Sequence, residues 1–207
     1  MIAGMVDSTG FFTLGHVFTA HVTGNIVLAA SVAVEGGSFH WVQLLAIPVF
    51  MLALATVWLV AQASRRHGPS LARLLLLVQF LLLVALLIFT VITKASADRV
   101  GLLAGTAAMI AVSAMACQYA LLCLAVPGAI STAVMTGNLA NAVLSAMDLL
   151  SARHRLLPQD STPLSRSLGR LLGFLAGCVV AAAAASLAGD WAWSLPAALA
   201  AVAVAVR

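Results

Sequence analysis

The sequence predicts an all-α, polytopic membrane protein built from two internal repeats, with about seven membrane segments and a possible range of six to eight. First, 63% of the 207 residues are hydrophobic, only 8% are charged, and the mean hydropathy is +1.13. A soluble domain carries about 25% charged residues. Second, the apolar runs are continuous rather than alternating, which favours membrane helices over a barrel. Third, the polar tripeptide Thr-Gly-Asn occurs twice, at 23–25 and 136–138.

Six apolar stretches predict the membrane segments in order. A helix that crosses the hydrocarbon core needs about 20 apolar residues. Five stretches have this length and a shorter one ends the chain: 41–63, 71–93, 100–125, 129–149, 166–188 and 190–206. The first 34 residues are also apolar, but Gly15-His16 and Thr23-Gly24-Asn25 interrupt them. This first stretch is long for one span and short for two.

The two tripeptides lie at equivalent positions of the predicted repeats. Thr136 follows Thr23 by 113 positions, and the same offset brings the longer pattern T-x-x-x-T-G-N into register. An acidic residue then closes each segment, and further hydrophobic stretches follow. We therefore expect a first repeat over 1–93 and a second over 100–207. The second has a complete first helix, whereas the first has only a stump, so we expect this chain to start later than its relatives.

The orientation of the repeats stays open. If 100–125 and 129–149 both cross the membrane, the repeats are parallel; if 100–149 crosses once with a re-entrant piece, they are inverted. The positive-inside rule does not choose, because either arrangement places most Lys and Arg residues on one side. The segment lengths favour the parallel arrangement.

The Thr-Gly-Asn elements are the first candidate site. Glycine permits close approach of a ligand or backbone, asparagine has two donors and an acceptor, and threonine can bond to a carbonyl of the preceding turn. One interpretation is a pair of helix breaks that line a substrate or ion site between the repeats. The alternative is a helix-packing seam, since each glycine follows an alanine by four positions. The residues concerned are Thr23, Gly24, Asn25, Thr136, Gly137 and Asn138.

Three further polar residues are candidates. Asp7 is a carboxylate inside an early apolar segment, and ionisable groups there indicate a function by default. It can bind a cation or carry a proton, or it can lie in water at the membrane interface. Its equivalent in the second repeat is Ala120, so any role is asymmetric. Gln118 and Asn141 either line the same cavity or form hydrogen bonds between helices.

Other residue types favour structural interpretations. His16 and His21 are five positions apart, roughly 140° around a helix, which is poor for one metal ion. We expect no metal or other cofactor. The sequence has no Walker loop, no serine elbow and no paired catalytic carboxylates, so we expect that the protein is not an enzyme. The four tryptophans fall in or near span ends and read as interfacial anchors: Trp41, Trp58, Trp191 and Trp193.

The stretches "AGMVDSTGFFTLGHVFTAHVTGN" and "MACQYALLCLAVPGAISTAVMTGNL" resemble the YoaK-like family of uncharacterised bacterial inner-membrane proteins. The matching positions of the first motif are Asp7, Gly10, Phe11, Leu14, Gly15, Phe18, Thr23, Gly24 and Asn25. Those of the second are Gln118, Ala120, Ser131, Thr132, Thr136 and Gly137. Tyr119 stands where the family usually has asparagine. The resemblance spans essentially the whole chain and implies a polytopic inner-membrane fold of about six to eight helices. It implies no substrate.

The sequence therefore predicts a multi-pass protein of the bacterial inner membrane that transports or binds a small solute or ion between its repeats, near the Thr-Gly-Asn motifs. The alternative is a membrane interaction or accessory protein without transport. The expected partners are the lipid bilayer and an unknown small solute or ion, with a homodimer possible. Basic runs interleaved with aromatic residues are lacking, so we expect no nucleic-acid binding.

Overall fold

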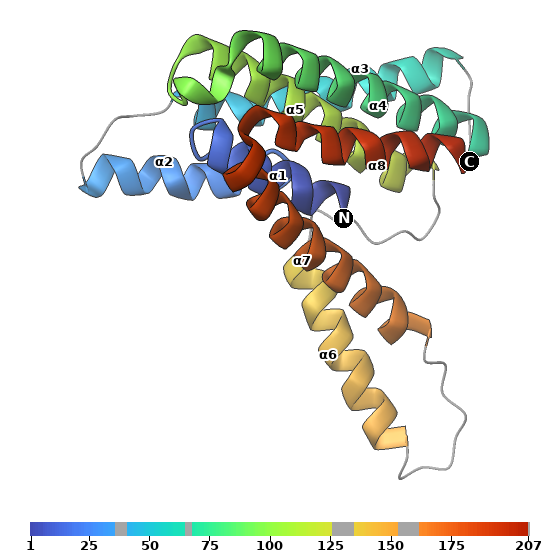
Figure 1. Cartoon of the computed structure of the whole chain (residues 1–207). Helices are drawn as coiled ribbons and strands as arrows, with labels where there is room; N and C mark the ends of the chain where they lie inside the picture. The colour runs from blue at the N-terminus through green and yellow to red at the C-terminus, as the bar shows by residue number, and fades with distance from the viewer. Residues whose placement is uncertain (36–40, 65–67, 126–134, 153–161, 207) are drawn as a thin grey trace.

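The computed structural model describes the chain except residues 36–40, 65–67, 126–134, 153–161 and 207 (Figure 1). The described residues form helices and their connections, with no strand among them, which confirms the all-α prediction. The helices are α1 (Ile2–Thr13), α2 (Gly24–Glu35), α3 (Trp41–Ser64), α4 (Gly68–Thr93), η1 (Ala95–Ala97), α5 (Leu102–Ala120), the π-helical turn η2 (Leu121–Ala125), α6 (Met135–Ala152), α7 (Thr162–Ala188), η3 (Gly189–Trp193) and α8 (Ser194–Ala205).

Within the described part of the chain, four helical stretches are long and apolar enough to cross a membrane. They are Trp41–Ala63, Pro69–Thr93, Leu102–Ala125 and Leu164–Ala205, the last of which includes α7, η3 and α8. The predicted segments 41–63, 71–93, 100–125 and 166–188 coincide with α3, α4, α5 with η2, and α7. Helix α6 covers most of the predicted segment 129–149, whose first residues lie outside the described part. The total number of membrane segments stays a prediction.

The early helix break lies where the sequence places it. Helix α1 ends at Thr13, and Gly15 and His16 both adopt positive φ angles, 80° and 58°. A non-glycine residue rarely takes this left-handed conformation, so the chain turns sharply out of the helix here. The next helix begins only at Gly24. Residues 14–23 form a connection, which we call the 14–23 loop.

The long helices form a bundle from which α6 and α7 extend as a separate arm. Helix α5 packs between α3 and α4, and α4 also packs on α8. Figure 1 shows α3, α4, α5 and α8 side by side, whereas the hairpin of α6 and α7 reaches away from them. The middle of α7, around Phe174 and Gly177, packs on α1. Helix α1 therefore connects the arm with the bundle.

Helices α1 and α7 approach each other closely, and two glycines permit this contact. A Cβ atom added at Gly4 would lie 2.3 Å from the carbonyl oxygen of Phe174. One added at Gly177 would lie 2.4 Å from the carbonyl oxygen of Met1. Both contacts are with backbone, which cannot rotate away. Small residues at such crossings let membrane helices approach closely.

The helix contacts exchange partners between the predicted repeats. The offset of 113 places α1 over the end of α5 and η2, α2 over most of α6, and most of α3 over α7. In the structure α1 packs on α7, as α5 packs on α3, and α2 packs on α3, as α6 packs on α7. Two repeats whose first helices were swapped would give this arrangement. The division at 1–93 and 100–207 stays a prediction.

The prediction that all four tryptophans are interfacial anchors is wrong for one of them. Trp41, Trp58 and Trp191 are exposed, as anchors should be, but Trp193 is fully buried. It lies in η3, where the chain bends between α7 and α8, and its ring reaches the neighbourhood of Gly10. The sequence interpretation was wrong because an apolar span end next to a bend turns inward and becomes part of the core.

Candidate functional site

Asp7 accepts hydrogen bonds from the 14–23 loop through both carboxylate oxygens. Its Oδ1 accepts from the backbone N–H of Thr19 (2.7 Å), the hydroxyl of Thr19 (2.9 Å) and the backbone N–H of Ala20 (2.6 Å). Its Oδ2 pairs with Nδ1 of His21. Asp7 is only 4% exposed, so these bonds replace the water that a buried carboxylate loses. The interpretation of Asp7 as a group in water at the interface is thus corrected.

Asn25 holds the same loop from its other end. Its Oδ1 accepts from the N–H of Phe18, and its Nδ2 donates to the carbonyl of Phe18, both at 2.8 Å. Because the amide matches the two backbone groups of one residue, a single side chain satisfies both. Asn25 is fully buried. The first Thr-Gly-Asn element is therefore the start of a helix whose asparagine fixes the loop before it.

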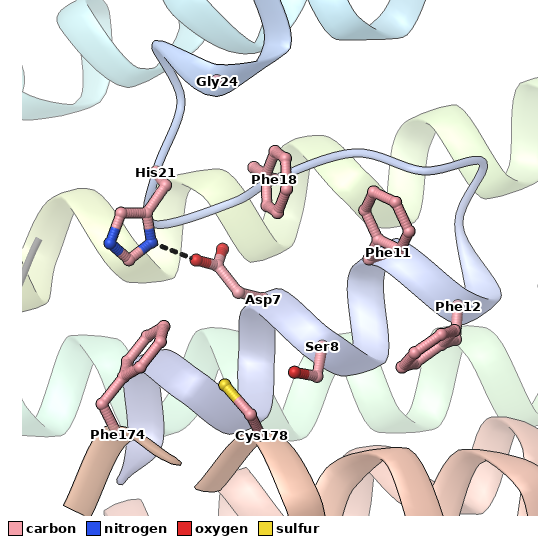
Figure 2. A pocket seen from close by; sticks show the side chains of 9 residues that line it. All are labelled: Asp7, Ser8, Phe11, Phe12, Phe18, His21, Gly24, Phe174 and Cys178. Atoms are coloured by element: carbon pink, nitrogen blue, oxygen red, sulfur yellow. Dashed lines mark hydrogen bonds and ion pairs between the residues drawn. The ribbon is translucent and has the colours of Figure 1, made fainter. Parts of the chain in front are cut away.

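The loop and three helices border an open cavity of about 490 Å³ beside Asp7 (Figure 2). Its lining is mostly aromatic, with a few groups that can form hydrogen bonds. The lining residues are Asp7, Ser8, Phe11 and Phe12 of α1, Phe18 and His21 of the loop, Gly24 of α2, and Phe174 and Cys178 of α7. We call it the Asp7 cavity. Its size and composition are typical of sites for small organic molecules.

His21 is the polar group with the greatest chemical capacity here. When the ring is neutral, Nδ1–H donates to the carboxylate and Nε2 is an acceptor. Figure 2 shows this second nitrogen on the side of the ring away from Asp7. The ring also meets that of Phe174 edge to face, at 5.3 Å between centroids. The pair can therefore accept a hydrogen bond from a ligand through Nε2 of His21.

The structure brings only some of the sequence candidates together. Asp7 and Gly24 line the Asp7 cavity, whereas Thr23, Thr136 and Asn141 are exposed. Gly137 is half-buried, and Asn138 is fully buried at the start of α6. Gln118 accepts a hydrogen bond from Gln79 of α4 at 2.8 Å. It lines a different cavity, which also touches Phe174.

Sequence reasoning missed the aromatic wall and the partner of Asp7. Phe11, Phe12 and Phe18 are ordinary members of an apolar stretch, and Phe174 lies more than 150 residues away. His21 was interpreted as a structural residue, and its pairing with Asp7 was not predicted. Among the described residues no group of three or more His, Cys, Asp or Glu side chains could hold a metal ion. The i, i+4 spacing of Phe174 and Cys178 places both on one face of α7, and this spacing alone could have suggested that they act together.

The comparison with protein families covers almost the whole chain. The matching family model is described as "Protein of unknown function (DUF1275)", and it matches residues 1–206. The chain belongs to this family. The finding agrees with the resemblance to the YoaK-like proteins, and the name DUF1275 carries no activity. No curated protein and no solved structure matches the chain.

Proposed function

We propose that this DUF1275 protein is a membrane transporter or solute-binding protein whose ligand occupies the Asp7 cavity. The observation that carries the proposal is a buried carboxylate–imidazole pair in the wall of an open, aromatic cavity of about 490 Å³. Ionisable groups among apolar helices are costly and commonly mark substrate or proton pathways. The four helical stretches of sufficient length and hydropathy support a location in the membrane. We place the protein in the bacterial inner membrane and infer no catalysis.

The lining of the cavity indicates the class of solute. Four phenylalanine rings favour an apolar body, and their faces attract a cation. The neutral His21 ring presents an acceptor, and Asp7 contributes a negative charge behind it. A small, largely apolar organic amine satisfies all three features. Protonation of His21 would remove the acceptor, so that binding of the amine and binding of a proton compete at one ring.

A solute screen on purified full-length protein tests the proposal. Small organic amines should raise the melting temperature, and they should slow the reaction of Cys178 with a thiol reagent, because Cys178 lines the same cavity. The protection is best measured with Cys117 and Cys123 replaced by alanine. His21→Gln should abolish the protection and the uptake of the amine into proteoliposomes.

His16→Asn is the matched control. His16 is exposed and lies in the left-handed region, which asparagine tolerates. This variant should bind and transport like the wild type. Protection of Cys178 that is equal in the His21 and His16 variants would contradict a site at the Asp7 cavity.

One observation favours the alternative of an accessory protein without transport. All four bonds of Asp7 and both bonds of Asn25 go to this chain's own loop. A purely structural role would need nothing more. In that case Asp7→Asn would change stability, and no amine would bind either the wild type or the variant.

A further inference from the structure

A second cavity of about 370 Å³ lies near the start of α7, where α1, α5 and α6 approach it. Phe174 lines both this cavity and the Asp7 cavity. The other residues that matter here are Gln118, Ser165, Arg166, Gly169 and Arg170. Unlike the Asp7 cavity, this one has a substantially polar wall. We call it the arginine cavity.

Arg166 and Arg170 line the arginine cavity, and no carboxylate is among the described residues that line it. Arg166 and Arg170 are four positions apart, so they lie on the same face of α7. Within the described ranges neither arginine forms an ion pair. The ion pair found there joins His21 and Asp7. Nη1 of Arg170 is buried and has no hydrogen-bond partner among the described residues. A buried donor of a charged group that lacks a partner is costly, which indicates that the cavity is built for an anion.

The geometry also leaves room for that anion. A Cβ atom added at Gly169, between the two arginines, would meet no atom of the described residues within 4 Å. The hydroxyl of Ser165 and the amide of Gln118 add neutral hydrogen-bonding groups to the wall. Guanidinium groups match the oxygens of phosphate as two-pronged donors. Outside the cavity α7 exposes Leu168 and Leu172, an apolar surface suited to acyl chains.

We propose that the arginine cavity binds a phosphate group, with Arg170 as its principal ligand and Arg166 as the second. Two sources share this chemistry: the headgroup of an anionic phospholipid and a soluble phosphate ester. Basic pockets between membrane helices bind lipid headgroups in other proteins, and the exposed leucines favour that source. The proposal stands independently of any solute in the Asp7 cavity.

The test uses the full-length protein with two probes. In nanodiscs of phosphatidylcholine with added phosphatidylglycerol, native mass spectrometry measures how much phosphatidylglycerol each chain retains. In detergent, thermal unfolding measures binding of glycerol 3-phosphate. Arg170→Gln should weaken binding of the effective probe roughly tenfold or more, the scale of a hydrogen bond to a charged group. Arg166→Gln should weaken it less, because Arg166 is exposed.

Two further variants separate the cavity from general charge and from misfolding. Gly169→Leu keeps both arginines but fills the open space, so it should block binding. Arg99→Gln removes one charge from an exposed position outside the cavity and should leave binding unchanged. Retention of phosphatidylglycerol that depends on Arg170 supports the lipid source; binding of glycerol 3-phosphate alone supports the soluble one. If neither probe binds, or if Arg99→Gln weakens binding as much as Arg170→Gln, the proposal is overturned.

Discussion

Removal of the Asp7 carboxylate should release the 14–23 loop from α1. Two of its four donors are backbone N–H groups, those of Thr19 and Ala20, which cannot turn to other partners. Each buried donor left without a partner costs about 1–3 kcal/mol, so Asp7→Ala should lower the free energy of unfolding by about 2–6 kcal/mol. Asp7→Asn keeps an oxygen in place and loses only the charge. Because charge-assisted bonds are about twice as strong as neutral ones, it should cost about half as much.

Two measurements test the effect of these substitutions, one on global stability and one on the local hydrogen bonds. Unfolding by sodium dodecyl sulfate in mixed micelles, monitored by circular dichroism, gives the difference in global stability. Hydrogen exchange gives the local effect, and the amides of Thr19 and Ala20 should lose protection in Asp7→Ala while those of α4 keep it. If both substitutions cost the same, or if the two amides stay protected in Asp7→Ala, the carboxylate is not what holds the loop.

Two more substitutions have matched controls in the chain. Asn25→Ala removes both bonds to Phe18 and should lower the free energy of unfolding by about 2–4 kcal/mol. Asn141→Ala, at an exposed position, should change it by less than about 0.5 kcal/mol. Equal losses of stability in chemical denaturation would contradict the role of Asn25 in holding the loop. Gly4→Ala places a methyl group 2.3 Å from a backbone oxygen of α7 and should cost about 1–3 kcal/mol through overpacking. Gly169→Ala meets open space and should be neutral or stabilise by up to about 1 kcal/mol. If Gly169→Ala lowers the melting temperature more than Gly4→Ala does, the close crossing of α1 and α7 is refuted.

Local sequence features predicted the helices well because their causes are local. Continuous apolar runs predicted the long helices, and Gly15-His16 predicted the break. Both residues adopt positive φ angles, which end a helix locally. The burial of Trp193 could not be predicted, because it depends on the direction of the chain after η3. The same holds for the Asp7–His21 pair. It requires a reversal of the loop, which composition and spacing do not specify.

The meaning of Thr-Gly-Asn needed the tertiary structure for the same reason. The sequence offered two interpretations, a lining of the site and a packing seam, and both place the motif at the contact between the two repeats. In the structure the Asn25 side chain bonds instead to the backbone of Phe18, seven positions earlier in the same segment. Side-chain bonds to nearby backbone are favoured at helix starts. The motif therefore shapes the wall of the Asp7 cavity indirectly, by fixing the loop that carries Phe18 and His21.

The described residues that line a third cavity include no carboxylate, unlike those of the Asp7 cavity. A cavity of about 460 Å³ lies between α3 and the end of α5, and its lining includes Trp58, Tyr119 and Cys123. Position 120, the equivalent of Asp7 at the offset of 113, is a fully buried alanine. Ala120 does not line the third cavity, so a proton or a cation finds a carboxylate partner in the Asp7 cavity and none among the described residues of the other. If Asp7 couples binding to protonation, substitution of Tyr119 or Cys123 by alanine should leave uptake of an amine intact while His21→Gln abolishes it, and equal losses would show that the two cavities act as one.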